Sequence, residues 1–125
     1  VGDFDGDGAE EILTISKFHG DTLSVWHATD DEDVYSCVWT DPVRRNFLHA
    51  IWSGELAGKP CAVVGNRKEG RDLLRVHFAD GEYAVEQIDH DRGPANCWVI
   101  NDGDEQRIIA ANRETNEVAL YTVSE

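Results

Sequence analysis

The sequence has no apolar run that approaches the length of a membrane-spanning helix, so we expect no insertion into a membrane. It also has no sustained apolar spacing of three and four residues, which is the pattern that predicts amphipathic helices. Helices are therefore expected to be few. With 125 residues, of which 41% are apolar, the chain is long enough to fold as one modest domain.

Positive charge is scarce, with 11 Lys and Arg residues against 25 Asp and Glu residues, and the net charge is −14. A nucleic-acid backbone or an anionic membrane would repel such a chain, so we expect neither as a partner. An excess of carboxylates suits the binding of divalent cations, although it serves plain solubility equally well.

Cysteine is sparse, and Cys37, Cys61 and Cys97 are odd in number and far apart. Their spacing matches neither a zinc site nor a redox pair, and each lies in an apolar, strand-like segment. We therefore expect buried free thiols, with one disulfide and a spare cysteine as the alternative. The chain begins with Val1 and shows no secretory signal, which predicts a part of a longer protein and leaves the compartment open.

What the sequence does contain is a series of short β-branched and aromatic runs separated by Gly, Asp, Asn and Glu. The predicted strands span residues 11–16, 22–28, 34–40, 47–53, 60–66, 73–79, 83–89, 96–101, 106–112 and 117–123. With a short stub before Asp3, the chain is predicted to be all-β, with about eleven strands. Most of the tryptophans in these strands are expected in the cores between sheets: Trp26, Trp39, Trp52 and Trp98.

The strands recur as a repeat. Residues 23–27 match residues 73–77 at an offset of 50, and a second set of matches has an offset of 46. The second set pairs Trp52 with Trp98, Asn66-Arg67 with Asn112-Arg113, and Leu74 with Leu120. Periods of about 40–50 residues with four strands each are typical of β-propeller blades, which bury their faces against neighbouring blades.

Residues 3–11 carry five acidic side chains and two glycines and run directly into an apolar strand. Oxygen donors at alternate positions, with glycine where the loop turns, are what a hard divalent cation requires. An EF-hand is excluded, because its twelfth position would be Thr14 and the flanking residues are predicted strands. The sequence therefore predicts a metal-binding turn between two strands.

Together with the strands that follow, residues 1–28 resemble the FG-GAP or VCBS type of calcium-loop repeat, which is also found in the propellers of integrin α-subunits. The resemblance implies a structural calcium ion held by four carboxylates and one backbone carbonyl, from Asp3, Asp5, Asp7, Glu11 and Ala9 respectively. Glu11 departs from the family, in which Asp is commoner at the closing position. The resemblance also favours an extracellular or cell-surface location.

The repeat divides the chain into an incomplete blade at residues 1–45, a complete blade at 46–91 and an incomplete blade at 92–125. About two and a half blades would leave sheet edges and apolar faces uncovered. We therefore expect either further blades of the same propeller or association between copies. The equivalent loops at 53–60 and 101–105 lack ligands or the closing residue, so one metal site is expected.

A second candidate site follows from blade geometry, on the side of the disc opposite the acidic loop. The repeat brings basic and amide side chains to nearby positions around the propeller axis: Lys17, His49, Asn66, Arg67, Asn96, Asn112 and Arg113. They would form a pocket for a carbohydrate, a carboxylate or a phosphorylated small molecule. The structural alternative is that each arginine pairs with a glutamate of the neighbouring blade, such as Glu69 or Glu114. His27 and His77 occupy equivalent strand positions and are interpreted as repeat residues rather than ligands.

The leading hypothesis is a calcium-binding β-propeller segment that acts as a non-catalytic binding or scaffold module. The alternative is part of a propeller enzyme, a lyase or hydrolase acting on sugars or anionic small molecules, in which His49, Arg67 and Arg113 lie at the active site. A third hypothesis is a purely structural remnant that closes a larger propeller.

Overall fold

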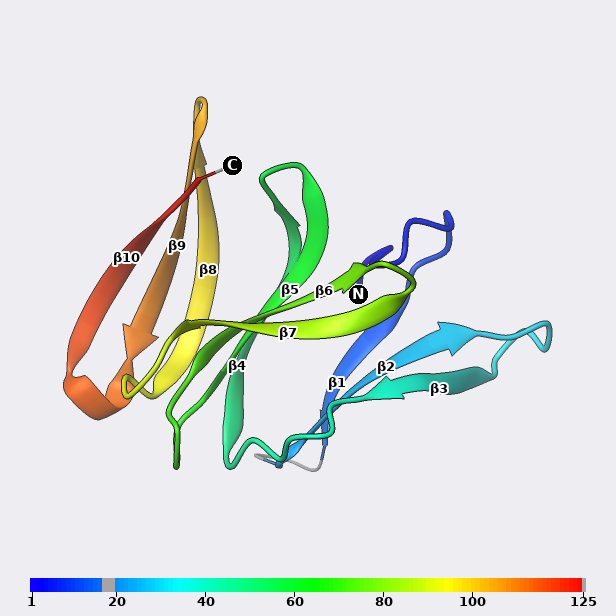
Figure 1. Cartoon of the computed structure of the whole chain (residues 1–125), viewed down its shortest axis with the longest axis horizontal. Helices are drawn as coiled ribbons and strands as arrows, with labels where there is room; N and C mark the ends of the chain where they lie inside the picture. The colour runs from blue at the N-terminus through cyan, green and yellow to red at the C-terminus, as the bar shows by residue number, and fades with distance from the viewer. Residues whose placement is uncertain (17–19, 125) are drawn as a thin grey trace.

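The computed structural model describes residues 1–16 and 20–124, and across these residues the chain is almost entirely β-structure. Three antiparallel sheets follow one another along the chain (Figure 1). The first contains β1 (Ile12–Ser16), β2 (Thr22–Ala28) and β3 (Tyr35–Thr40); the second β4 (Leu48–Leu56), β5 (Lys59–Asn66), β6 (Leu73–Ala79) and β7 (Glu82–Asp89); the third β8 (Pro94–Asp102), β9 (Glu105–Asn112) and β10 (Glu117–Val123). A short 3-10 helix, η1 (Arg113–Thr115), joins β9 to β10. The all-β prediction is confirmed.

Each sheet is a meander in which consecutive strands pair, and the predicted strands agree closely with the observed ones. β4 and β5 extend further than predicted, because the tight turn at Ala57 and Gly58 lets them pair as far as Leu56 and Lys59. Both turn residues have positive φ, 51° and 72°, the geometry that matches the twist of two-residue hairpins. The predicted stub before Asp3 appears as an isolated bridge between Gly2 and Glu11.

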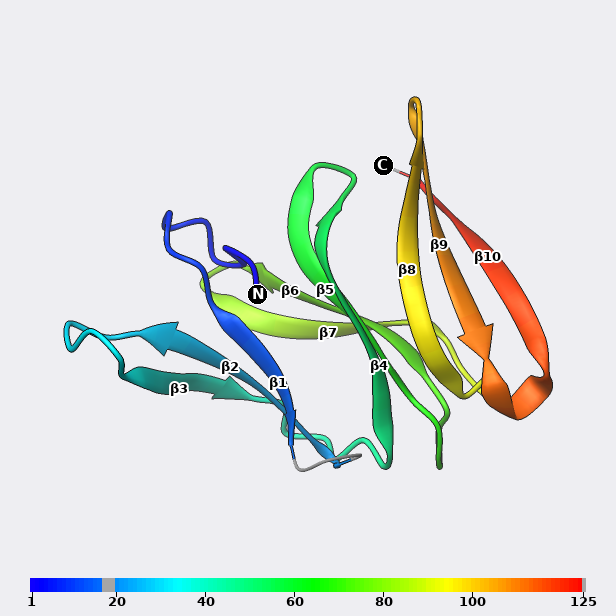
Figure 2. The ribbon, with the colours of Figure 1, turned by 180° about the vertical axis from the view of Figure 1, so that it is seen from behind.

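The second sheet lies between the other two, as front and back views show (Figures 1 and 2). Because side chains alternate along a strand, Ala62 and Val64 on β5 face the first sheet, and Cys61 and Val63 face the third. The first core comprises Phe4, Leu13, Leu23, Val25, Leu48, Ala62, Val64, Leu74 and Val76. The second core comprises Ala50, Leu56, Cys61, Val63, Leu73, Cys97, Val99, Ile108 and Ala110.

The predicted equivalence of Leu74 and Leu120 is wrong by one residue. Leu74 pairs with Val64 and is 1% exposed, whereas Leu120 pairs with Ile109 and is 59% exposed. The connection from β9 to β10 is shorter than that from β5 to β6, and a one-residue shift moves a side chain to the other face of the sheet.

The outer face of the third sheet is apolar and uncovered by any described residue. Trp98 is 64% exposed there, with Ile109 beside it on β9 and Val118 and Leu120 exposed on β10. The prediction that most tryptophans lie in the cores between sheets is therefore wrong for Trp98, because no described sheet follows the third. Its equivalent in the second sheet, Trp52, packs against the second core.

All three cysteines are free thiols, so the disulfide alternative is wrong. Cys61 and Cys97 are buried as predicted, and burial raises the pKa of the Cys97 thiol to about 12. Cys37 is exposed, contrary to the prediction, because β3 is an edge strand whose sheet is covered on one face only.

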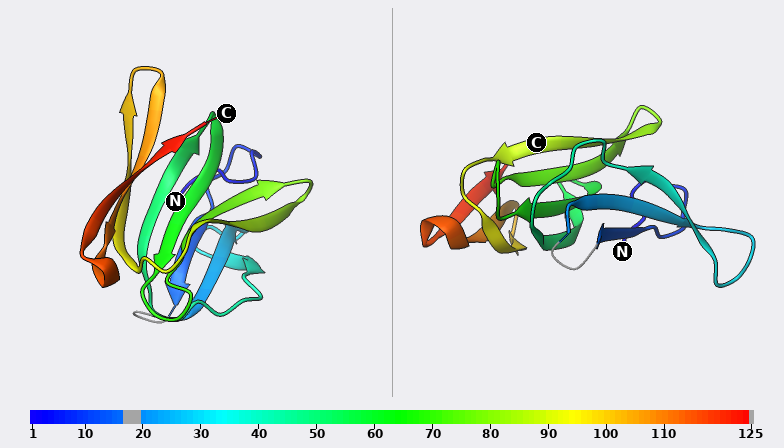
Figure 3. Two further views of the ribbon diagram at one scale, coloured as in Figure 1. Left: turned by 60° about the vertical axis from the view of Figure 1, so that its left-hand side comes forward. Right: turned by 90° about the horizontal axis from the view of Figure 1, so that it is seen from below.

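The two ends of the stacked sheets differ in what they carry. The left-hand view of Figure 3, like Figure 1, places the acidic loop at the same end as the β4–β5 and β8–β9 turns, with η1 and the β5–β6 loop at the opposite end; the right-hand view is seen from below. The acidic loop and η1, which begins with Arg113, are thus at opposite ends. Within the part of the chain that the structure describes, no helix has the length and apolar character needed to cross a membrane.

Candidate metal centre

The acidic loop folds around its own carboxylates. It is closed by two backbone hydrogen bonds between Gly2 and Glu11, of 3.1 and 2.8 Å. Within it, Asp5 Oδ1 accepts the amide of Asp7 at 3.0 Å, and Asp7 Oδ1 accepts the amide of Ala9 at 2.8 Å. Short acidic side chains favour such local turns because each carboxylate reaches the amide two residues further on. The carboxylates are thereby held at fixed positions.

Asp3 takes part in the loop in a different way. One oxygen, Oδ2, accepts the amide of Gly8 at 3.0 Å. The other, Oδ1, is buried and has no hydrogen-bond partner within the protein. Gly8 itself has a φ of +93°, and the glycine at position 6 has a φ of +75°, so both sit where a side chain would be strained. The glycines thus permit the reversal that brings the carboxylates together.

Glu11 is fully buried, which is uncommon for a carboxylate. Its Oε2 accepts the backbone amides of Phe4 at 2.7 Å and Asp5 at 3.4 Å. Its Oε1 has no hydrogen-bond partner within the protein. Burial raises the pKa of this carboxyl group, since removal from water disfavours the charged form. A buried carboxylate oxygen without a donor calls for a cation nearby.

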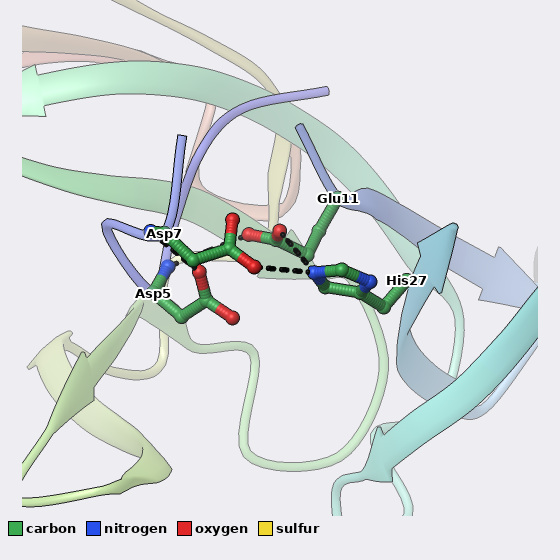
Figure 4. Close-up of side chains that lie close together, drawn as sticks. All are labelled: Asp5, Asp7, Glu11 and His27. Carbon is green, nitrogen blue, oxygen red and sulfur yellow. Dashed lines mark hydrogen bonds and ion pairs between the residues drawn. The ribbon is translucent and has the colours of Figure 1, made fainter. Parts of the chain in front are cut away.

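His27, on β2, is the cation nearest to these oxygens. Its Nε2 lies 2.8 Å from Asp7 Oδ2 and 3.5 Å from Glu11 Oε1, and its Nδ1 lies 2.8 Å from the carbonyl oxygen of Ala28 (Figure 4). The bond to the Ala28 carbonyl and the bond to Asp7 raise the pKa of His27 to about 9. The hydrogen bonds from the Ala9 amide and from His27 lower the pKa of Asp7.

The structure brings four side chains together in one group. Asp5, Asp7, Glu11 and His27 each offer one donor atom, and these atoms lie within 4.8 Å of one another. Three of the predicted carboxylate ligands are in this group. His27 was interpreted from sequence as a repeat residue, and that interpretation missed its contact with the loop. Asp3 lies outside the group, and the role of the Ala9 carbonyl stays a prediction.

The second sheet also approaches the loop. Tyr83, on β7, has a pKa raised by burial and by the nearby carboxylates Glu11 and Asp5, which disfavour a phenolate. A cavity of about 400 Å³ lies between the loop and the second sheet. Its lining includes Asp5 on the loop side and Lys59 and His77 on the sheet side. The centre therefore lies at a junction between two sheets and is open to solutes on one side.

The predicted basic pocket at the opposite end of the sheets consists largely of side chains with internal partners. Arg67 Nε lies 3.0 Å from Glu114 Oε1 and its guanidinium stacks over the Phe47 ring at 4.9 Å. This ion pair joins the second sheet to η1, as the structural alternative predicted. His49 Nδ1 lies 2.5 Å from the carbonyl oxygen of Ala95.

The amides of this region are engaged in the same way. Asn66 is buried, donates to the carbonyl oxygen of Lys68 at 2.8 Å and accepts the amide of Asp72 at 3.0 Å. Asn112 is also buried and donates a hydrogen bond to the carboxylate of Glu117. Asn96 is exposed, and its Oδ1 accepts a hydrogen bond from the amide of Cys97. Arg113 is exposed beside a shallow hollow that also includes Asn116. Lys17 lies outside the described residues. Ligand binding at these positions stays a prediction.

The Arg67–Glu114 pair leads to a testable expectation. Both side chains are mostly buried, 23% and 29% exposed, so the pair is less screened than a surface ion pair. We expect a coupling energy of roughly 1 kcal/mol in a double-mutant cycle of Arg67→Met and Glu114→Gln, measured by urea denaturation. A coupling energy indistinguishable from zero would leave Arg67 available for a ligand and would contradict the structural role.

Comparisons with protein-family models, with curated proteins and with solved structures find no match for this chain. The resemblance of residues 1–28 to calcium-loop repeats therefore stays a prediction from the sequence. The argument for a metal centre rests on the geometry of the group formed by Asp5, Asp7, Glu11 and His27.

Proposed function

We propose that the chain is a segment of a β-propeller, in which each sheet is one blade, and that it serves as a metal-braced binding or scaffold module. The observation that carries the proposal is the order of packing. Three meander sheets stack in chain order, and the first strands of the second and third sheets, β4 and β8, lie next to each other. Such nearest-neighbour stacking of one repeated unit is the construction principle of propellers.

Equivalent residues support the same arrangement. Trp52 and Trp98 pair with Val63 and Ile109, positions that are also 46 residues apart, so the offset holds for the first two strands of both sheets. The third sheet carries Trp98 on its outer face, where the second sheet carries Trp52 against the second core. A further blade, or the first sheet of another copy, would cover this face as the third sheet covers the second.

The acidic loop has the role of a brace in this proposal. Glu11 closes the loop through its backbone bridge with Gly2, and its side chain is buried inside the loop. The carboxylates gathered around it repel one another unless a cation is present. We assign calcium to the loop on the strength of its oxygen-rich sequence. The free oxygen of Glu11 and the buried free oxygen of Asp3 support this assignment, because both lack a donor within the protein.

A thermal melt tests the metal role. A ligand that binds the native state alone stabilises it by mass action, by about 2.7 kcal/mol at a concentration one hundred times the dissociation constant. We expect the midpoint to rise by several degrees in millimolar calcium relative to chelator, and Asp7→Asn to abolish most of that rise. Asp102→Asn, at the end of β8 beside the turn that stands in place of the acidic loop in the third sheet, is the matched control and keeps the full rise. An unchanged midpoint in millimolar calcium would remove the metal brace from the proposal.

A further inference from the structure

The ring of His27 presents its Nε2 atom to the loop. A carbonyl oxygen can only accept a hydrogen bond, so Nδ1 must carry the proton that is donated to Ala28 at 2.8 Å. Nε2 faces Asp7 Oδ2 at 2.8 Å and Glu11 Oε1 at 3.5 Å, so without a metal ion it carries a proton and donates it to Asp7, and a metal ion bound here would replace that proton. Two acceptors at that distance repel each other unless a proton or a metal ion lies between them.

Each of the four side chains in the group uses one polar atom to bind the backbone and has another to offer. Asp5 and Asp7 accept the amides of Asp7 and Ala9, Glu11 accepts the amide of Phe4, and His27 donates to Ala28. Such outer bonds fix the orientation of metal ligands in protein sites. A bond from an imidazole N–H to a backbone carbonyl is one of the usual ways in which a ligating histidine is held.

Glu11 provides a second, independent reason to place an ion here. Its side chain is fully buried, and Oε1 points into the group, where it accepts no hydrogen bond and has His27 Nε2 at 3.5 Å as an ion-pair partner (Figure 4). A carboxylate that only made the loop acidic would be at the surface, in water. Burying it next to Asp5 and Asp7 is costly without positive charge; the His27 ring supplies one charge, and a divalent ion in its proton's place would balance more of the three carboxylates.

The donor set of the group also suits a second class of ion. Calcium takes six to eight oxygen ligands, whereas this group offers three carboxylates and one imidazole nitrogen. Imidazole suits zinc and its neighbours in the transition series, and zinc is commonly four-coordinate with nitrogen and oxygen donors. We infer that the centre binds a zinc-type divalent transition-metal ion through Asp5, Asp7, Glu11 and His27. The inference rests on the proposed metal brace and assigns it a second class of ion.

The chain contains a matched control for His27. His77 occupies the same position on β6, 50 residues later, and its Nδ1 is buried without a hydrogen-bond partner. The loop beside it, residues 53–60, carries one acidic residue and Lys59 in place of the carboxylate series. His77 thus repeats the histidine outside the four-residue group, although it lines the same cavity as Asp5, and its substitution tests whether a histidine near the loop is enough.

The experiment is a titration of the metal-stripped full chain with cobalt, the spectroscopic substitute for zinc, followed by competition with zinc. Cys37→Ser is the background, because an exposed thiol also binds cobalt. We expect one cobalt ion per chain, with the visible absorption of a four-coordinate site, displaced by zinc. His27→Gln should lower the affinity for cobalt relative to calcium by about tenfold or more, since even outer-shell losses cost 10- to 100-fold. His77→Gln should leave that ratio unchanged.

Each alternative result has a definite meaning. A calcium-dependent rise in the melting midpoint without cobalt binding overturns the inference and leaves the proposed brace in place. Equal cobalt affinity in His27→Gln and the parent chain also overturns it, because the imidazole is then no ligand. Binding of neither ion removes both proposals. Circular dichroism of each variant shows that a loss of binding comes from the substituted ligand and not from unfolding.

Discussion

Replacing Leu74 with alanine will lower the free energy of unfolding by about 2–5 kcal/mol. Leu74 lies on β6, is 1% exposed and belongs to the first core. The same core includes Leu23 and Val25 of β2, which are fully buried. Its truncation removes apolar contact area and leaves a cavity between two sheets, which the hydrogen-bonded strands can fill only in part by moving inward. Since domains are ordinarily stable by about 5–15 kcal/mol, the loss is a large share of the total.

Urea denaturation followed by tryptophan fluorescence measures this loss. The matched control is Leu120→Ala, the same chemical change at a leucine that is 59% exposed on the outer face of the third sheet. We expect that control to lie within about 0.5 kcal/mol of the parent chain. If the two variants were equally destabilised, the register of β10 described above would be in error, and Leu120 would face the second core.

The strands were predictable because their signal is local. Alternating apolar residues and the turn residues between them fix where each strand begins and ends, so the predicted range 73–79 coincides with β6. The side of the sheet that each residue faces was harder to predict at the end of the chain. There the register of β10 depends on the geometry of η1, and a difference of one residue in that connection reverses every side chain.

The candidate metal centre was predictable only in part, for a related reason. Asp5, Asp7 and Glu11 are close in sequence, so their spacing alone indicates a shared ligand. His27 reaches the same point from β2, at a sequence distance of 16 residues from Glu11, through the pairing of β1 with β2. The predicted pairing of neighbouring strands could have indicated the contact of His27 with the loop, since the strand that carries His27 runs beside the strand that follows the loop. Burial of Glu11 depends on tertiary packing and has no signature in the sequence.

A methyl group at Gly65 will force the second and third sheets apart. An ideal Cβ at this position would lie 2.4 Å from Cγ of Pro94, and 3.3 Å from Cβ of Ala50. Pro94 is fully buried and its ring is rigid, so it cannot turn aside as a long side chain would. We expect Gly65→Ala to destabilise the chain by about 1–3 kcal/mol, the range for overpacked cores, and Gly65→Val to cost more.

The third sheet supplies the control for this expectation. Ala111 occupies the position of Gly65 on β9, 46 residues later, and is exposed because no described sheet covers it. In the second sheet this position contacts the third sheet and is occupied by glycine, Gly65. In the third sheet it contacts no described sheet and is occupied by alanine, Ala111. Ala111→Val should therefore be nearly neutral in urea denaturation, since a β-branched residue suits an exposed strand position. A Gly65→Ala variant as stable as the parent chain would mean that the second and third sheets pack less closely than this contact requires.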